Sequence, residues 1–176
     1  EIEKLQAEEK ETLRQARALF EDLFEFCPDA LIVVDIQGRI TRMNTEAERL
    51  FGYAREELIG KDHGILVPDR HRDKHDAELK VFVRQPHVRV MGIGLELYGR
   101  KKSGAEFPAD IDLGPLKIGD EMLVLAVVRD VTPRKKLEDN LIRSERRYRE
   151  LVELSPDAVL IGSEGKIVFL NTAGAR

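Results

Sequence analysis

Apolar residues recur every three or four positions along residues 1–26, and nothing in this stretch breaks a helix. The spacing predicts a long helix with a narrow apolar stripe, as in a coiled coil or a helix bundle. Glu9 and Thr12 interrupt the stripe. Its members are Ile2, Leu5, Ala16, Leu19, Leu23 and Phe26. A solvated helix that is ordered only by its neighbours is the alternative interpretation.

Strand patterns and short helical patterns alternate between residues 27 and 132. Pro28 and Asp29 end the first helix, and the turn around Gly38 joins two short strands into a hairpin. Short helices follow, and then three more strands. The expected strands are 31–34, 40–43, 90–98, 106–116 and 122–131. This order predicts an α+β domain in which a five-stranded antiparallel sheet carries short helices on one face.

One of these helices places a titratable group among apolar side chains. Pro68 opens the helix, and Pro86 ends it because proline disfavours helical backbone in the residue before it. The face at spacings of four, seven and eight residues carries His75, Leu79, Phe82 and Val83. The imidazole is therefore expected to look into an apolar compartment, with the strand at 92–94 as its opposite wall.

Thr132 and Pro133 begin a second long helix, with a hydroxyl that can cap it and a proline at its first position. Residues repeat along this helix at alternating spacings of four and three, which predicts a second coiled-coil segment. They are Leu137, Leu141, Ser144, Tyr148 and Leu151. The chain then repeats itself, because residues 155–161 echo 27–33 and residues 165–172 echo 38–45.

Four segments follow from these patterns. They are a signalling helix at 1–26, a folded domain at 27–132, a coiled-coil linker helix at 133–154, and the first hairpin of a second, incomplete domain at 155–176. Two strands alone are marginally stable, so the last segment is expected to pair with something else.

Composition narrows the choice of partner and location. The net charge of -4 and the pI of about 5.7 provide no basic field for nucleic acid or an anionic membrane. The apolar runs are strand-sized, far short of the ~18 residues of a membrane span, so no membrane contact is expected. The single cysteine, Cys27, cannot form an internal disulfide, which fits a reducing cytoplasm. We therefore expect a cytoplasmic chain with a protein partner.

The sequence does not predict an enzyme. No glycine-rich phosphate loop follows a strand. The phospho-acceptor of a kinase would be a histidine in a helix after the domain, and no histidine occurs beyond His87. His63 and His87 fall in loop-like stretches and are expected to be solvated. His71 and His75 are four residues apart and could chelate a divalent ion on a helix, but the sequence shows no third ligand nearby.

Five short motifs, in order and at consistent intervals, resemble the PAS sensor domain family. They are residues 28–35 with 38–40, residues 44–53, residues 56–60, residues 99–108 and residues 129–132. The resemblance covers about 27–132 and restarts at 155. It implies the PAS fold and a regulatory module of a two-component system, belonging to a histidine kinase or a cyclic-di-GMP enzyme. It also implies a homodimer formed through the flanking helices, acting on its own downstream output domain.

Within that family, residues 75–116 are similar to the haem-binding, oxygen-sensing FixL type. The resemblance implies haem b as the cofactor, with His75 as the ligand of the haem iron. The pocket that it implies consists of His75, Leu79, Arg89, Val90, Ile93, Leu95, Ile111 and Leu113. Leu95 and Val81 stand where the FixL type has arginines, so the oxygen response of that type is not expected to carry over unchanged.

Two main interpretations of the domain stay open, and the binding of a metal or of a non-covalent flavin is a third. The first is a sensor of a small ligand, with haem as its sharpest version. The second is a ligand-free dimerisation and signal-relay module in which His75 is a partly buried histidine satisfied by its neighbours. The covalent flavin chemistry of light-sensing relatives is not expected, because the only cysteine, Cys27, precedes the first strand.

Overall fold

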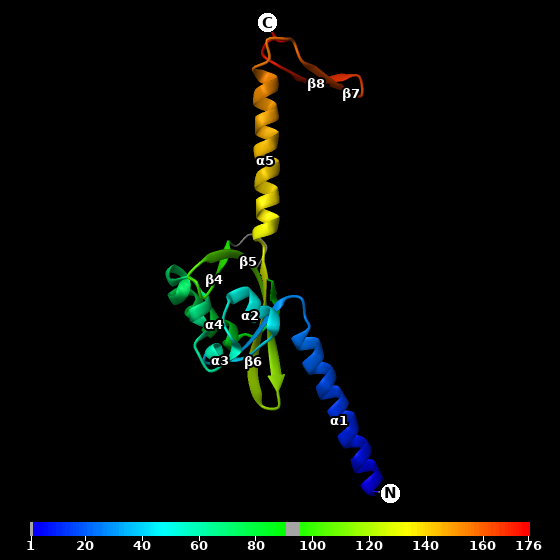
Figure 1. The fold of residues 1–176 in the computed structure, drawn as a ribbon, viewed down its shortest axis with the longest axis vertical. Coiled ribbons are helices and arrows are strands. Elements are labelled where there is room, and N and C mark those ends of the chain that lie inside the picture. The colour runs from blue at the N-terminus through cyan, green and yellow to red at the C-terminus, as the bar shows by residue number, and fades with distance from the viewer. Residues whose placement is uncertain (1, 91–95) are drawn as a thin grey trace. The chain divides into compact units, whose positions relative to one another are not determined.

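The computed structural model describes residues 2–90 and 96–176, which divide into two compact units at residues 1–131 and 132–176. The first unit holds a long helix, a sheet and several short helices, and the second holds a long helix and a hairpin (Figure 1).

The first unit is organised by an antiparallel sheet in the order β2-β1-β6-β5, with β3 and β4 both pairing along the outer edge of β5. Its strands are β1 (Ala30–Asp35), β2 (Ile40–Met43), β3 (Arg89–Val90), β4 (Leu97–Arg100), β5 (Glu106–Ile118) and β6 (Glu121–Asp130). The sheet therefore has five strand positions, and the predicted α+β fold with a five-stranded antiparallel sheet is confirmed.

Two short strands occupy the fifth position of the sheet, where the sequence predicts a single strand at 90–98. Val90 pairs with Asp112, and Leu97 pairs with Ala109. Six residues thus separate the two pairs on one side of the ladder, and only two separate them on β5. Because a continuous antiparallel ladder advances equally on both strands, β3 and β4 are in different registers. The strand expected at 90–98 is thus described only at its two ends, because residues 91–95 lie outside the described residues.

Short helices cover one face of the sheet and bury its apolar side chains (Figure 1). These helices are α2 (Thr45–Phe51), α3 (Arg55–Leu58), the 3₁₀ turns η1 (His63–Leu66) and η2 (Asp69–His71), and α4 (Arg72–Arg84). The fully or nearly fully buried members of this core include Ile32, Ile40, Phe51, Leu58, Phe82, Phe107 and Val124. Alternation along β1 sends every second residue into this core, as a strand with two different faces requires.

The other face of the sheet packs against α1 (Ile2–Glu25). Phe24 is buried there against Leu31 and Val33 of β1. Phe20 stacks on Phe24 with 6.2 Å between ring centroids, and the guanidinium of Arg42 lies within 5.4 Å of both ring centroids. The end of α1 is thus attached to the sheet by aromatic packing and a cation–π contact.

This attachment uses a different face of α1 from the stripe predicted for a coiled coil. Leu19, Leu23 and Phe26 of that stripe are between 61% and 80% exposed. These residues of the stripe are therefore not buried against the sheet, and the coiled coil stays a prediction.

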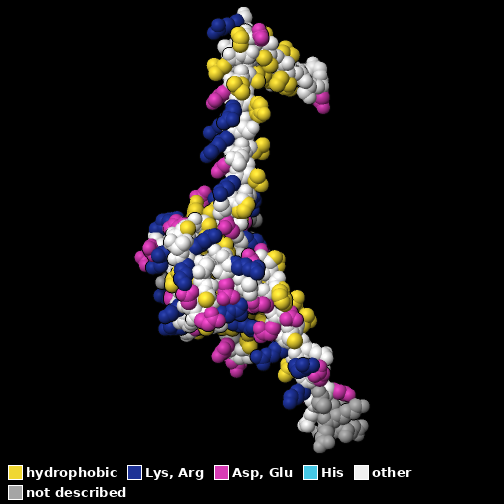
Figure 2. Space-filling view, viewed as in Figure 1, with side chains coloured by type: hydrophobic (Ala, Val, Ile, Leu, Met, Phe, Trp, Pro, Cys, Tyr) yellow, Lys and Arg dark blue, Asp and Glu magenta, His cyan; other side chains and the backbone are white. Residues whose placement is uncertain are grey.

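The second unit consists of α5 (Thr132–Glu153) and a hairpin of β7 (Leu160–Ser163) and β8 (Lys166–Leu170). No residue of α5 is buried. Its apolar side chains line one side of the helix while Lys and Arg gather on the other (Figure 2). The exposed apolar side chains are Leu137, Leu141, Ile142, Tyr148 and Leu151. Across the described residues, no helix has both the length and the apolarity of a membrane span.

Candidate functional site

His75 lies on α4, half-buried, on the helix face that the sequence predicts. Leu79 and Phe82 follow it along that face, and Phe82 is buried in the core. The imidazole borders two small cavities between α4 and the sheet. His75 thus lies between the helical layer and the sheet, in contact with the space that separates them.

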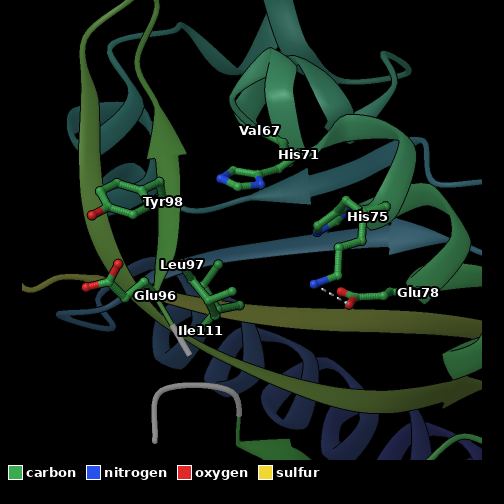
Figure 3. A pocket seen from close by; sticks show the side chains of 9 residues that line it. Val67, His71, His75, Glu78, Glu96, Leu97, Tyr98 and Ile111 are labelled. Atoms are coloured by element: carbon green, nitrogen blue, oxygen red, sulfur yellow. Dashed lines mark ion pairs between the residues drawn. The ribbon is translucent and has the colours of Figure 1, made fainter. Parts of the chain in front are cut away.

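The larger cavity has a volume of about 120 Å³ and is lined by α4 on one side and by the β4–β5 edge on the other (Figure 3). Polar groups are supplied by His71 at the end of η2 and by Lys74 and Glu78 of α4, where Lys74 lies 3.9 Å from the carboxylate of Glu78. Tyr98 faces them from β4. The apolar part of the lining consists of Val67, Leu97 and Ile111. The cavity therefore offers both polar and apolar contacts.

The smaller cavity has a volume of about 40 Å³ and lies against the middle of the sheet. Apolar side chains from four elements enclose it, namely Val34, Leu79, Leu113, Val124 and Ala126. His75, Glu78 and Arg89 provide its polar groups. Since a single water needs roughly 10–15 Å³ of such space, this cavity has room for a few waters at most.

His63 and His75 are hydrogen-bonded to each other. The Nε2 atom of His63 lies 2.9 Å from the Nδ1 atom of His75, and the ring centroids are 4.8 Å apart. The Nδ1 atom of His63 lies 2.8 Å from the carbonyl oxygen of Gly38. A polar chain therefore runs from the β1–β2 turn through η1 to α4.

The order of donors along this chain follows from its first member. A carbonyl oxygen can only accept, so Nδ1 of His63 carries the proton. In the neutral form Nε2 of His63 is then an acceptor, and Nδ1 of His75 must donate to it. In neutral His75, Nε2 is consequently the acceptor nitrogen of the ring. This is the tautomer that a histidine presents when Nε2 ligates a metal and Nδ1 is held by a second partner.

Gly38 is the residue that allows this chain to form. Its φ of +83° lies in the left-handed region that favours glycine. A Cβ atom there would come within 2.8 Å of Cε1 and Nδ1 of His63. The turn thus needs glycine twice, for its backbone conformation and for the close approach of the imidazole.

The structure brings together most of the predicted pocket residues. His75, Leu79, Arg89 and Leu113 line the smaller cavity, and Ile111 lines the larger one together with His75. Val90 lies on β3. Ile93 and Leu95, and the wall expected at 92–94, lie outside the described residues.

The prediction that His63 is solvated is wrong. Only 9% of its surface is exposed, because η1 packs against the sheet and turns its ring toward Gly38 and His75. A signal was present in the sequence, since Asp62 caps the amide of Gly64 and an apolar pair, Ile65 and Leu66, follows. Sequence reasoning also missed Glu78 and Tyr98.

The described residues meet one requirement of haem but not another. His75 has the donor chemistry and the tautomer of an axial ligand. The cavities beside it measure about 120 and 40 Å³, whereas pockets for drug-sized ligands begin at roughly 300 Å³. The described cavities therefore do not fit a macrocycle, and a smaller ligand matches them better.

His71 borders the larger cavity together with His75. Among the residues that the structure describes, no group of three or more His, Cys, Asp or Glu side chains is placed to hold a metal ion. A structural zinc site needs four ligands, so this pair of histidines alone does not define one.

An antiparallel sheet with short helices over one face, and a small cavity between the two layers, defines the class of α+β domain to which the first unit belongs. The family described as "PAS domain" matches residues 28–133, and a second match to a family of the same description covers residues 146–176. The chain belongs to the PAS domain family.

Two curated relatives and one solved structure illustrate the similarity. The chain is 32% identical to the sensor protein FixL of Bradyrhizobium diazoefficiens over 143 residues, which are 81% of this chain and 28% of that protein. It is 28% identical to the cell-division control histidine kinase PdhS of Brucella ovis over 139 residues, which are 79% of this chain and 13% of that protein. The chain thus spans less than a third of either relative.

Among solved structures, the PAS domain of an HTR-like protein from Haloarcula marismortui superposes with a TM-score of 0.60 at 22% identity. The superposition covers 70% of this chain and 98% of that one. This likeness shows the fold.

Proposed function

We propose that this chain senses a small ligand in the cavity beside His75 and relays the signal through its long helices to an output domain. One observation carries the proposal. Val124 and Ala126 of β6 line the smaller cavity, and β6 ends at Asp130, two residues before α5 begins at Thr132. A strand that lines the smaller of the two cavities at His75 therefore continues along the chain into the helix that leaves the domain.

The cavity favours a small ligand with both polar and apolar parts. The acceptor nitrogen of His75 suits a ligand that carries a hydrogen-bond donor or a Lewis-acidic centre. His75, Leu79, Arg89, Ile111 and Leu113 are the proposed contact residues, with Glu78 added. Haem is not our choice, because the described cavities are too small for it.

A second candidate is a ligand-free relay in which the long helices pair with those of another copy. The exposed apolar side chains of α1 and α5 favour it, because a helix with a wholly exposed apolar stripe is completed by a partner. Both candidates share the homodimer and the output domain. We propose a histidine kinase as that output, since relatives such as PdhS are histidine kinases, with a cyclic-di-GMP enzyme as the alternative.

Disulfide trapping along α5 tests the relay. In a Cys27→Ser background, Leu141→Cys places a thiol on the predicted stripe, and Asp139→Cys places one on the opposite side of the same helix. Mild oxidation is expected to trap dimers several times more efficiently through position 141 than through position 139. Equal trapping at both positions, or none at either, would contradict pairing through α5.

The same trapping separates the two candidates. If the cavity controls the helix, His75→Ala is expected to change the yield at position 141, and native mass spectrometry of the unaltered chain is expected to detect a bound small molecule. An unchanged yield with no bound molecule favours the ligand-free relay. A Soret band after addition of haem, absent from His75→Ala, would instead identify haem as the ligand.

A further inference from the structure

A buried asparagine joins three elements where α1 enters the first unit. Asn44 is fully buried, and its Oδ1 atom accepts from the backbone amides of Leu31 at 2.9 Å and Ala47 at 3.0 Å. Its Nδ2 group donates to the carbonyls of Phe24 at 3.2 Å and Asp29 at 2.9 Å. One side chain thus ties the end of α1 to the start of β1 and to the first turn of α2.

The same arrangement occurs independently in the second unit. Asn171 is also fully buried, and its Oδ1 atom accepts from the amides of Val159 and Gly174, both at 2.9 Å. Its Nδ2 group donates to the carbonyls of Val152 at 3.0 Å and Asp157 at 2.9 Å. The sequence repeat aligns Val159 and Asp157 with Leu31 and Asp29, and Val152 and Gly174 correspond to Phe24 and Ala47 when the same offsets are continued beyond the repeat.

A hydroxyl–carboxylate contact accompanies each asparagine. Thr45 donates its hydroxyl to the carboxylate of Glu25 in the last turn of α1. Thr172 donates to Glu153 in the last turn of α5, at 3.0 Å. The side chain that follows the asparagine therefore holds the same point of the preceding helix in both units.

In the first unit an arginine extends the contact. Arg55 pairs with Glu25 at 2.8 Å and with Glu48 at 2.7 Å. These contacts lower the pKa of Glu25, mainly through the hydrogen bond from Arg55 and then through that from Thr45. The end of α1 is thus held by charge as well as by the asparagine.

Only asparagine satisfies this geometry. The partners of Nδ2 are carbonyls and those of Oδ1 are amides, so the site needs a donor and an acceptor on one short, planar side chain. Aspartate supplies no donor, and alanine supplies neither. Because every direct partner is a backbone group, the neighbouring residues differ between the units while these four bonds recur, and Asn44 adds a further donation to the carbonyl of Cys27 at 3.4 Å. The asparagine is therefore the residue that specifies the junction.

We propose that Asn44 and Asn171 are coupling residues, each of which makes the last turn of the entering helix move as one body with the first strand of its domain. This proposal rests on the proposed relay. We call the asparagine and its backbone partners the joint, because they connect the entering helix to the strand. Without the joint, displacement of the helix would be absorbed by the short segments at 26–29 and 154–159. With it, the displacement reaches β1 or β7 directly. In this scheme α5 enters its hairpin in the way that α1 enters the first sheet.

Hydrogen exchange of the full chain tests the joint locally. Asn44→Asp keeps the acceptor and removes the bonds that Nδ2 donates, and Thr45→Val removes the hydroxyl that contacts Glu25. Both are expected to speed amide exchange at residues 20–26 relative to the remainder of the first unit, tenfold or more for Asn44→Asp and less for Thr45→Val. Asn171→Asp is expected to act on residues 148–154 and to leave 20–26 unchanged.

A matched control distinguishes coupling from general weakening. Thr41→Val also removes one hydroxyl bond, from Thr41 to the carbonyl of Val33, but that bond does not involve α1. It is expected to leave exchange at 20–26 unchanged relative to the sheet. The proposal is overturned if the asparagine and Thr45 variants raise exchange uniformly across a unit, or if Asn171→Asp has no local effect. Hydrogen exchange at the joint does not depend on dimer formation. Failure of disulfide trapping would therefore refute the relay, whereas the role of the asparagines would still be decided by the exchange data.

Discussion

The polar chain from Gly38 through His63 to His75 has a direction, because its first acceptor is a carbonyl oxygen. When both rings are neutral, that direction determines which nitrogen of each imidazole carries the hydrogen. A residue far from α4 in the sequence thereby determines what His75 presents to its surroundings.

Replacing His63 removes the acceptor from His75. His63→Phe fills the space of the ring but removes the hydrogen bond between the two imidazoles, which is expected to cost about 1–3 kcal/mol of unfolding free energy. His75 is also expected to lose its preference for the Nδ1–H tautomer, which ¹⁵N chemical shifts of the imidazole report. His87→Phe is the control, because His87 is exposed. An unchanged His75 tautomer in His63→Phe would contradict the donor order.

Gly38 and Gly104 provide a matched pair of glycines for testing the close approach of His63. Their φ angles are +83° and +84°, but only at Gly38 would a Cβ atom meet a neighbour, the ring of His63 at 2.8 Å. Gly104→Ala is expected to cost only the conformational penalty of about 1–2 kcal/mol. Gly38→Ala is expected to cost at least about 1 kcal/mol more, because the ring must shift. Denaturant unfolding of both variants measures the difference, and equal losses would show that His63 does not crowd the turn.

The ion pairs at the end of α1 predict a response to acid. Hydrogen bonds from Arg55 hold the pKa values of Glu25 and Glu48 below their usual range. A lowered pKa in the folded state contributes stability that is present above the unfolded-state value of about 4.3 and is lost as the pH falls through the folded-state value. Since these side chains are partly exposed, Glu25→Gln is expected to cost about 1 kcal/mol or less at pH 7.

That cost should shrink as the pH falls below about 4.3 and should disappear once Glu25 is protonated in both states. Urea unfolding of the unaltered chain and of Glu25→Gln at pH 7, 5, 4 and 3 tests this. Glu46→Gln is the control, because the ion pair of Glu46 is with Arg49 of the same helix, α2. A difference between Glu25→Gln and the unaltered chain that stayed constant down to pH 3 would rule out the ionic contribution.

At the scale of elements, α1 carries two apolar faces and the sheet uses one of them. Phe24 is buried against the sheet, whereas Phe26 is 80% exposed two residues later. Phe24→Ala is expected to lower the free energy of unfolding by about 3 kcal/mol, as for other buried aromatic residues. Phe26→Ala is expected to change it by less than about 0.5 kcal/mol in the monomer. Similar losses in the two variants, measured by denaturant unfolding at low concentration, would mean that α1 does not dock through Phe24.

Local patterns predicted most elements because apolar residues recur at a period of two along a strand and of about 3.6 along a helix. Alternation and turn residues located the strand positions, and the spacing from His75 to Phe82 located the inner face of α4. The choice between the two faces of α1 could not be made in this way. Both faces are apolar, and the partners that select Phe20 and Phe24 come from the distant residues Arg42 and Leu31.

The site was less predictable than the fold for the same physical reason. The sequence could indicate a capped turn at Asp62 but not how deeply that turn buries His63, because the depth of a turn depends on what packs over it. Likewise, the different registers of β3 and β4 depend on pairing with β5, which lies later in the chain. The apolar pocket residues could be predicted because they belong to periodic elements. The polar partners of His75 could not, because they come from a turn and a 3₁₀ segment.

At the scale of the whole molecule, burial is divided unevenly between the two units. Both hydrophobic clusters of the described residues lie within residues 24–128, and Val131 is the last buried apolar residue. Beyond it the only fully buried side chain described is that of Asn171, while the apolar residues of β7 and β8 are mostly exposed. The first unit therefore has a core of its own, and the second has a junction but no core.

This division predicts how the chain responds to truncation. Residues 1–131 alone are expected to unfold cooperatively, with the midpoint and slope that the full chain shows for its sheet, because no described core residue is removed. Residues 132–176 alone are expected to show no cooperative transition, since a two-stranded hairpin is marginal without a further layer. Urea titrations followed by circular dichroism compare the three chains at low concentration. A large loss of stability in 1–131 would mean that the second unit supports the first, whereas a cooperative transition in 132–176 would mean that α5 and the hairpin bury more apolar surface, in one chain or between copies, than the described contacts show.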